Sequence, residues 1–339
     1  MTIRRSKIWL LTLTFSIIFI GCTKKSVPPN ITEHDTLASI QKVDDYPLYT
    51  MTYYGDYGFK EYLLTGNLPF FSSDVLQREE RFACTCFAAM GTKGSLIFSR
   101  NFDWQPNRAT YLLLVTDPPD GFASISMIDL GFLGYDDNAQ PNSSNNRTPL
   151  LNTPLFPFDG MNECGVAISM NAIPGAQSSY DPAKVTIGEL QVLRLVLDYA
   201  SNTEEAISLI QKYNVRIEDP PIHYLIADSS GHSTIIEFVD GNMIVMRNIE
   251  PWQVTTNFII SNSNAPENVS CWRYNTAYQT LKDNNGELSQ NTAMNLLHQV
   301  SLPGTRWSAV YDAKTMEVTV VMGRKYEEAH KFTIAKNNQ

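Results

Sequence analysis

The sequence predicts a layered α+β domain, and three observations support this prediction. Two neighbouring stretches with helical periodicity lie between blocks of short strand-like stretches. The strand-like stretches are separated by Gly, Asn and Asp, which is typical of antiparallel hairpins. The 339 residues, of which 43% are hydrophobic and 18% charged, have an ordinary globular composition. Helices segregated from antiparallel strands in one globular unit indicate an α+β architecture.

Charge and residue spacing argue against several classes of partner. The net charge of −9 leaves no basic patch, so no nucleic-acid partner is expected. The five histidines and five cysteines lack the spacing of a metal site or a disulfide framework. We therefore expect no metal and no cofactor. Disulfide pairing among Cys86, Cys164 and Cys271 stays open, as does assembly into a homo-oligomer.

Residues 1–22 have the pattern of a lipoprotein-type signal peptide. Three basic residues precede an apolar run from Ile8 to Ile20, and Gly21 and Cys22 follow it. The run has about 13 residues, which is short for a membrane span because a bilayer requires roughly 20. The pattern predicts export and lipidation of Cys22. The expected location is the membrane, with the protein anchored on a periplasmic or cell-surface face.

The stretch 84–104 predicts a β-hairpin. Its first half contains aromatic, β-branched and small residues, and its second half alternates in hydrophobicity. Gly91 and Gly94 stand between the halves as turn residues. Because side chains alternate along a strand, Cys84 and Cys86 share one face.

This hairpin resembles the nucleophile region of the linear-amide C–N hydrolases, the choloylglycine hydrolase and penicillin V acylase family, with isopenicillin N acyltransferase-like relatives. The resemblance lies in Cys-Thr-x-Phe-Ala-Ala, starting at Cys84, and Arg-Asn-x-Asp-Trp, starting at Arg100. Members are N-terminal-nucleophile hydrolases, in which Cys begins the mature catalytic chain. Arg and Asp follow sixteen and nineteen positions later, which here are Arg100 and Asp103. The resemblance implies a four-layer αββα sandwich of two antiparallel sheets.

A terminal nucleophile requires cleavage of the Ala83–Cys84 bond. Residues 23–83 are then a tether and a pro-segment, and residues 84–339 are the catalytic domain. Because the segment before Cys84 is rich in aromatic residues, a second interpretation stays open, in which it is an ordered part of the body.

Further strands are expected over 110–116 and 122–130, followed by a long loop over 134–157 that forms one wall of the substrate pocket. The following Asp-Gly-Met-Asn-Glu-x-Gly run, which ends at Asn171 before Pro-Gly, is again similar to the family. The resemblance implies that Asn171 helps to form the oxyanion hole. The alternative is an Asn that closes a turn.

The two helices have start signals. Thr186-Ile-Gly-Glu189 reads as a capping box that opens a helix to about Tyr199. Asn202 is the expected cap of the second helix. A three-stranded meander is predicted beyond them, over 222–228, 233–239 and 242–247.

Two later segments also resemble the family. Thr-Asn at Asn257 implies a second oxyanion donor, and Ser-x-x-Arg-Tyr at a helix start implies that Arg273 lies near the thiol. Without the resemblance, Asn257 reads as a turn residue and Arg273 as a surface arginine. Arg306 is an alternative arginine, in a strand over 304–312 paired with 316–322.

Amide hydrolysis needs an activated nucleophile and a stabilised oxyanion. A cation such as Arg100 favours the thiolate of Cys84. With no histidine in position, the free α-amino group of Cys84 is the expected base, since its ordinary pKa of about 8 suits proton transfer near neutral pH. Asp103 would orient this group, and Asn171 and Asn257 would donate to the oxyanion. The reaction proceeds through a thioester.

The expected substrate is a small-molecule N-acyl amide with a hydrophobic acyl part, such as a conjugated bile salt or penicillin V. The internal position of Cys84 is more like the acyltransferase branch, so acyl transfer stays an alternative. A surface lipoprotein that only binds a ligand is another. Cys86, on the same face, is the rival nucleophile.

Overall fold

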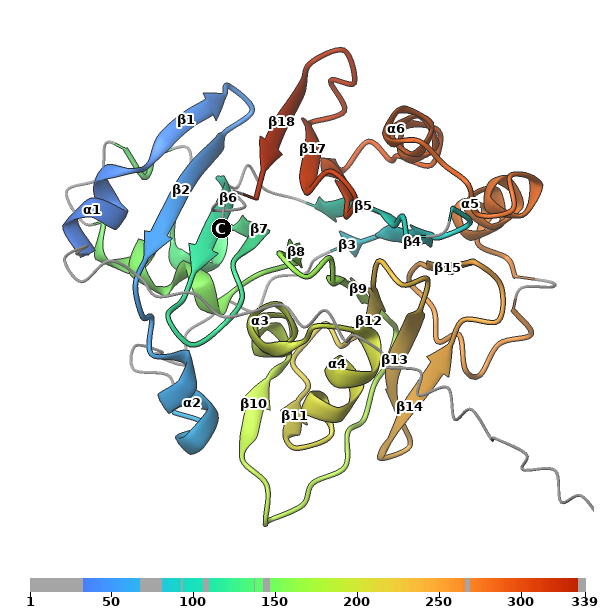
Figure 1. The fold of residues 1–339 in the computed structure, drawn as a ribbon, viewed down its shortest axis with the longest axis horizontal. Helices are drawn as coiled ribbons and strands as arrows, with labels where there is room; N and C mark the ends of the chain where they lie inside the picture. Colours follow the sequence, from blue (N-terminus) through green and yellow to red (C-terminus); the bar gives the residue numbers. More distant parts are fainter. Residues whose placement is uncertain are drawn as a thin grey trace, which may run out of the picture.

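The computed structural model describes residues 33–67, 81–92, 94–105, 110–136, 138–142, 147–265 and 269–334. The predictions for the signal peptide, for lipidation of Cys22 and for the start of the tether lie outside these residues. Within the described part of the chain, no helix is long and apolar enough to cross a membrane. Two large sheets dominate the fold (Figure 1).

The larger sheet has nine strands, in the order β1-β2-β6-β7-β8-β9-β12-β13-β14. Neighbouring strands are antiparallel except β2 and β6, which are parallel. The strands are β1 (Gln41–Asp44), β2 (Leu48–Tyr54), β6 (Tyr111–Asp117), β7 (Ser124–Asp129), β8 (Asp159–Asn162), β9 (Ala167–Ala172), β12 (Ile222–Ala227), β13 (Ser233–Val239) and β14 (Asn242–Arg247).

The smaller sheet has seven strands, in the order β15-β4-β5-β16-β17-β18, with β3 also paired to β5. All its pairings are antiparallel. The strands are β3 (Arg81–Phe82), β4 (Thr85–Ala89), β5 (Ile97–Gln105), β15 (Trp252–Thr255), β16 (Thr305–Asp312), β17 (Glu317–Met322) and β18 (Ala329–Thr333). The pairing of β4 with β5 confirms the predicted hairpin, and that of β16 with β17 confirms the late strand pair.

A pair of helices covers the outer face of each sheet (Figure 1). On the larger sheet, α3 (Glu189–Tyr199) packs against β8 and β9, and α4 (Thr203–Ile210) against β12. On the smaller sheet, α5 (Trp272–Asp283) packs against β15 and β4, and α6 (Gln290–Gln299) against β16 and β5. Strand β4 contacts β9 and β12 across the interface between the sheets. The α+β, four-layer αββα prediction is confirmed.

The segment before the hairpin is part of the fold. Strand β2 pairs with β6 along its whole length, from Leu48 opposite Tyr111 to Tyr54 opposite Asp117. Helices α1 (Glu33–Ala38) and α2 (Phe59–Thr65) flank the two N-terminal strands. The ordered-segment interpretation therefore describes residues 33–67. Cleavage at Ala83–Cys84 stays a prediction.

The predicted capping box is wrong. Residues Thr186–Gly188 form strand β10, which pairs in parallel with β11 (Asn214–Arg216). Helix α3 starts at Glu189, and its N-cap residue Gly188 offers no side-chain hydrogen bond. The strand pairing satisfies the backbone groups of 186–188, so the extended conformation prevails over the helical start.

The second helix and the meander match the sequence prediction. The Asn202 side chain accepts a hydrogen bond from the Glu205 backbone N–H at 2.9 Å and caps α4. Between β13 and β14, Asp240 and Gly241 both have positive φ, 51° and 75°, as a two-residue hairpin turn requires. The predicted loop over 134–157 is partly helical, because η2 (Thr148–Leu155) is a 3-10 helix with buried Leu150 and Leu155.

Candidate active site

Cys84 lies between the sheets, immediately before β4. Its side chain is buried. The chain on both sides of it pairs with β5, since Phe82 is opposite Trp104 and Thr85 is opposite Asn101. Cys86 and Arg100 are also opposite one another. The hairpin therefore brings Arg100 and both thiols to the same face, as the alternation of side chains predicts.

Arg100 is the cation beside the thiol. Its Nη2 lies 3.7 Å from Cys84 Sγ. On its other side, Nη1 donates to Asp159 Oδ2 at 3.0 Å and to the Phe158 carbonyl. The guanidinium also lies over the Phe102 ring, 4.7 Å from the centroid. These contacts fix a buried charge that has little freedom to move away from the sulfur.

Asp159 is a site residue that the sequence analysis did not assign. Besides pairing with Arg100, it accepts from Trp307 Nε1 at 3.0 Å and from the Tyr311 hydroxyl. It is the first residue of the Asp-Gly-Met-Asn-Glu motif, and the only site residue predicted from that part of the sequence was Asn171. A buried arginine requires a partner of opposite charge. The Asp at the start of this motif was therefore the sequence signal from which the partner of Arg100 could have been predicted.

Electrostatics at Cys84 are a balance of opposing effects. Burial raises the pKa of the Cys84 thiol, and the charge of Arg100 lowers it without cancelling the effect of burial. In the uncleaved chain the thiol therefore favours its protonated form, and Arg100 alone does not activate it. Burial raises the pKa of Cys86 to about 12, so Cys86 is the weaker candidate for a thiolate.

Asp103 lies on the opposite side of the strand from Arg100. Its Oδ1 accepts from the Thr305 hydroxyl, and its Oδ2 has no hydrogen-bond partner, with Arg273 Nη1 4.0 Å away. Burial raises the pKa of Asp103 to about 7, against the opposing effects of Thr305 and Arg273. An unsatisfied buried carboxylate oxygen at this position is suited to receive a new donor.

Asn257 and Arg273 hold the backbone of Cys84. The Cys84 N–H donates to Asn257 Oδ1 at 2.6 Å, and Asn257 Nδ2 donates to the Ala172 carbonyl at 2.7 Å. Arg273 donates to the Cys84 carbonyl and, at 3.0 Å, to Asn257 Oδ1. Arg306 instead donates to the Trp104 carbonyl and to the hydroxyl of Tyr46. Of the two arginines considered, Arg273 is the one at Cys84.

Asn171 reaches the site from β9. Its Oδ1 accepts from Cys86 Sγ at 3.0 Å and from Thr255 Oγ1 at 3.3 Å. Its Nδ2 is buried without a hydrogen-bond partner. An oxyanion hole requires a donor that is not already engaged, and Asn171 Nδ2 meets this requirement. The Asn171 side chain contacts the thiol of Cys86, however, and not that of Cys84.

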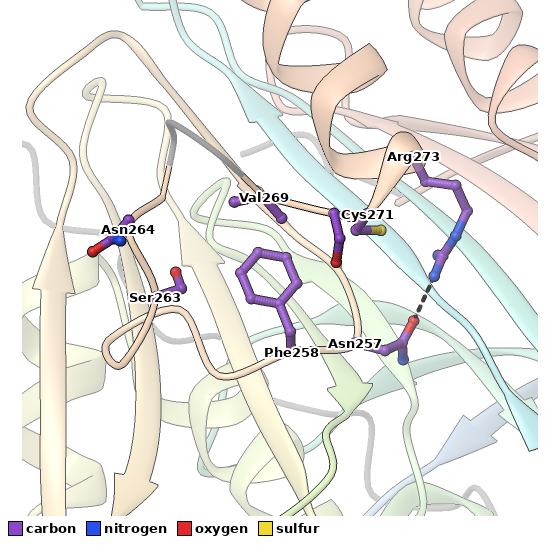
Figure 2. A pocket seen from close by; sticks show the side chains of 8 residues that line it. Asn257, Phe258, Ser263, Asn264, Val269, Cys271 and Arg273 are labelled. Atoms are coloured by element: carbon purple, nitrogen blue, oxygen red, sulfur yellow. Dashed lines mark hydrogen bonds between the residues drawn. The ribbon is translucent and has the colours of Figure 1, made fainter.

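A pocket of about 410 Å³ opens beside Asn257 and Arg273. Figure 2 shows the hydrogen bond between these two residues at one side of the pocket and Phe258 facing its interior. The lining is Asn257, Phe258, Ser263, Asn264, Val269, Ser270, Cys271 and Arg273. None of the described residues within 134–157 lines this pocket, so the wall predicted for that stretch is not confirmed here. Among the described residues, no group of three or more His, Cys, Asp or Glu could hold a metal ion.

The solved structures that share the fold include the following three. Penicillin V acylase from Agrobacterium tumefaciens is 18% identical, with a TM-score of 0.53 over 70% of this chain and 83% of that chain. A mutant of the conjugated bile acid hydrolase from Clostridium perfringens is 14% identical, with a TM-score of 0.51 over 75% and 93%. A variant of the same hydrolase is 13% identical, with a TM-score of 0.53 over 75% and 94%. At these identities the likeness concerns the fold alone.

The sequence comparison supports a family assignment in addition to the shared fold. No curated protein gives a significant match. The family model of the linear amide C–N hydrolases, choloylglycine hydrolase family, matches residues 84–311, which is most of the chain and starts at Cys84. The chain therefore belongs to the choloylglycine hydrolase family and is a hydrolase of carbon–nitrogen bonds in linear amides.

Proposed function

We propose that this hydrolase uses Cys84 as its nucleophile, after cleavage of the Ala83–Cys84 bond gives that residue a free α-amino group. The observation that supports the proposal most is the environment of Cys84. The thiol lies beside Arg100, and the backbone nitrogen that would become the α-amine donates to Asn257 Oδ1 at 2.6 Å. A group poised to act as nucleophile and a group poised to act as base are thus held in one residue.

Each step has a candidate residue. The free α-amine takes the thiol proton, and the sulfur attacks the amide carbonyl carbon. Asn171 Nδ2 is the unpartnered donor for the resulting oxyanion. The C–N bond then breaks, the amine leaves with the proton, and a thioester remains on Cys84. Water hydrolyses the thioester to a carboxylic acid and the free thiol.

Asp103 and Asn257 are proposed to hold the new ammonium. Asp103 Oδ2 lacks a hydrogen-bond partner in the uncleaved chain, and Asn257 Oδ1 already accepts from the Cys84 nitrogen. Two acceptors around a terminal amine would fix its direction toward the sulfur. This arrangement also gives Asn257 a role at the amine in addition to the oxyanion role that the family resemblance implies.

The proposed substrate is a small-molecule N-acyl amide with a hydrophobic acyl part. The similar structures are named for penicillin V and for conjugated bile acids, which are both N-acyl amides.

We also propose that residues 1–22 direct export and that lipidated Cys22 anchors the protein to the membrane. The intact mass of the exported protein tests this anchor, since a mature chain without diacylglycerol on Cys22 would contradict it.

The experiment that tests the function compares the wild type with Cys84→Ser and, as the matched control, Cys86→Ser. The substrates are glycine- and taurine-conjugated bile salts, penicillin V and N-acyl homoserine lactones, with release of the amine as the readout. We expect amine release and a mature chain that begins Cys-Thr-Cys-Phe, both lost in Cys84→Ser and retained in Cys86→Ser. A fully active enzyme with residue 83 still attached would refute the proposal. New N-acyl products with an added amine would indicate acyl transfer instead.

A further inference from the structure

A buried ion pair lies under the turn that carries Asn257. His223 on β12 has its Nδ1 2.9 Å from Glu237 Oε1 and its Nε2 2.9 Å from the Thr256 carbonyl oxygen. Both side chains are fully buried. Burial acts to raise the pKa of Glu237, but hydrogen bonds from His223 and Ser261 outweigh it and lower the pKa, so Glu237 is a carboxylate. A carboxylate and a carbonyl only accept hydrogen bonds, so both ring nitrogens donate and the two side chains form an imidazolium–carboxylate pair.

Glu237 binds the other end of the same turn. Its Oε1 accepts from the Ile260 backbone N–H at 2.8 Å, and its Oε2 accepts from the Ser261 backbone N–H at 3.0 Å and from its hydroxyl at 2.6 Å. The pair thus holds the main chain at 256 on one side and at 260–261 on the other. The residues between these anchors include Asn257 and Phe258, which both line the pocket.

The pair also joins the two sheets at the site. His223 is opposite Asn171 on β9, and the residue after Asn171 supplies the carbonyl that binds Asn257 Nδ2. Thr256, which His223 holds, follows directly after β15 of the other sheet. These strands therefore hold Asn257 at the Ala172 carbonyl and at Thr256, in addition to its hydrogen bonds with Cys84 and Arg273.

We propose that His223 and Glu237 are positioning residues, which fix the turn 256–261 and thereby aim Asn257 at the α-nitrogen and at the reacting carbonyl. The inference rests on the proposed function of Cys84. A buried ion pair is a poor source of stability, because desolvation offsets its Coulombic attraction. The His223–Glu237 pair lies beneath the turn, so its role is to position the residues that the turn carries.

Arg194 and Asp198 on α3 form a second buried pair that serves as a matched control. Arg194 Nη1 lies 2.9 Å from Asp198 Oδ1, and Arg194 Nε donates to the Pro154 carbonyl at 2.7 Å. Asp198 also accepts from the Tyr57 hydroxyl. Arg194 also binds hydroxyl groups on β6 and β7, and none of these contacts involves a residue of the candidate site.

The test compares two reactions of Cys84 in the full chain as it is produced. Acylation by a p-nitrophenyl ester forms a tetrahedral oxyanion, whereas alkylation by iodoacetamide does not. The variants are His223→Gln, Glu237→Gln and the milder Ser261→Ala, with Asp198→Asn as control and mass mapping to confirm labelling at Cys84. We expect the acylation rate to fall roughly 10- to 100-fold in the first two variants, with alkylation within about twofold of the wild type. Asp198→Asn should change neither rate.

The possible results distinguish a failure of the positioning role from a failure of the proposed function. Equal losses of acylation and alkylation, or unchanged acylation in folded His223→Gln and Glu237→Gln, would overturn the positioning role. If neither His223→Gln nor Glu237→Gln folds, Ser261→Ala is the deciding variant. An acylation-to-alkylation rate ratio equal to that of the wild type would then overturn the positioning role. A wild type whose Cys84 reacts no faster than its other thiols would instead overturn the proposed function, and the positioning role with it.

Discussion

Asp103 carries a buried carboxyl group of the candidate site with a raised pKa. Burial raises its pKa to about 7 from an ordinary value of 3.8. Between these two values the folded uncleaved chain binds more protons than the unfolded chain, so stability falls as the pH rises through this window. The same carboxylate, whose Oδ2 has no hydrogen-bond partner, weakens the uncleaved fold and is suited to bind an ammonium.

We predict that Asp103→Asn, made in an uncleavable Cys84→Ala background, removes this part of the pH dependence. At pH 8 the free energy of unfolding should rise by about 3 kcal/mol over the background, because no buried charge remains. Urea denaturation from pH 4.5 to 8 measures it. Asp198 and Glu189 also have raised pKa values, so the comparison is the difference between the two profiles. A flat difference would contradict the raised pKa of Asp103.

Arg100 should influence the reactivity of Cys84 through its charge. Because that charge lowers the pKa of the thiol, Arg100→Gln should move the pH profile of Cys84 alkylation to higher pH. Arg306→Gln is the control, since Arg306 bonds elsewhere in the same sheet. Iodoacetamide labelling between pH 6 and 10 measures both. Equal shifts in the two variants would mean that the effect is not local to Arg100.

At the residue scale, the sequence could place what one hairpin brings together. Arg100 and Asp103 follow from their spacing and from the alternation of side chains along one strand. Asp159 pairs with Arg100, and the Trp307 ring centroid lies 5.5 Å from the Arg100 guanidinium carbon, but neither could be placed in the same way, because they come from strands of different sheets. The partners of a buried charge depend on which strands become neighbours, and a single sequence does not contain that pairing.

The hairpin turn shows the same limit at the scale of an element. Gly91 and Gly94 were both expected as turn residues, but only Gly94 has a positive φ, 71°. A Cβ on Gly91 would lie 2.2 Å from the Asn285 carbonyl oxygen, and its N–H donates to the Gly286 carbonyl at 2.9 Å. Gly91 is therefore needed for close packing against the connection between α5 and α6.

We predict different costs for the two alanine substitutions. Gly91→Ala should destabilise the protein by about 3 kcal/mol, because backbone atoms block the added methyl group. Gly94→Ala meets open space and should cost about 1 kcal/mol, from its positive φ alone. Chemical denaturation measures both. Equal costs would show that backbone conformation, and not close packing, governs this turn.

The start of α3 was mispredicted for a related reason. Thr186 and Glu189 satisfy the local pattern of a capping box, and the helix itself was correctly expected to end at Tyr199. Strand β11, which takes Thr186–Gly188 out of the helix, lies beyond α4 in the sequence. Local signals set helix ends only where no distant strand competes for the same backbone.

Across the whole molecule, the layer order agreed with the sequence prediction, while the part played by residues 33–67 was left between two interpretations. Their aromatic content could indicate packing, but not that β2 would take a place between β1 and β6. Further contacts join this segment to distant parts of the chain. Asp44 pairs with His330 on β18 at 2.7 Å, and Tyr57 donates to Asp198 on α3.

We predict that cleavage at Ala83–Cys84 leaves the N-terminal fragment bound. Denaturing electrophoresis of the purified protein should show two chains, while native mass spectrometry should show one complex with the mass of both. The uncleavable Cys84→Ala variant should show one chain in both measurements. Recovery of the catalytic fragment alone, folded and active, would contradict the prediction.

The parallel pairing of β2 with β6 has a consequence for recovery from unfolding. Before cleavage, the two strands belong to one molecule, and refolding follows first-order kinetics. Afterwards they belong to separate molecules, so regain of activity becomes bimolecular, and its half-time should double whenever both fragments are diluted by half. A heat-treated mature enzyme would then regain activity slowly in dilute solution, whereas its precursor would refold at a rate that does not depend on concentration.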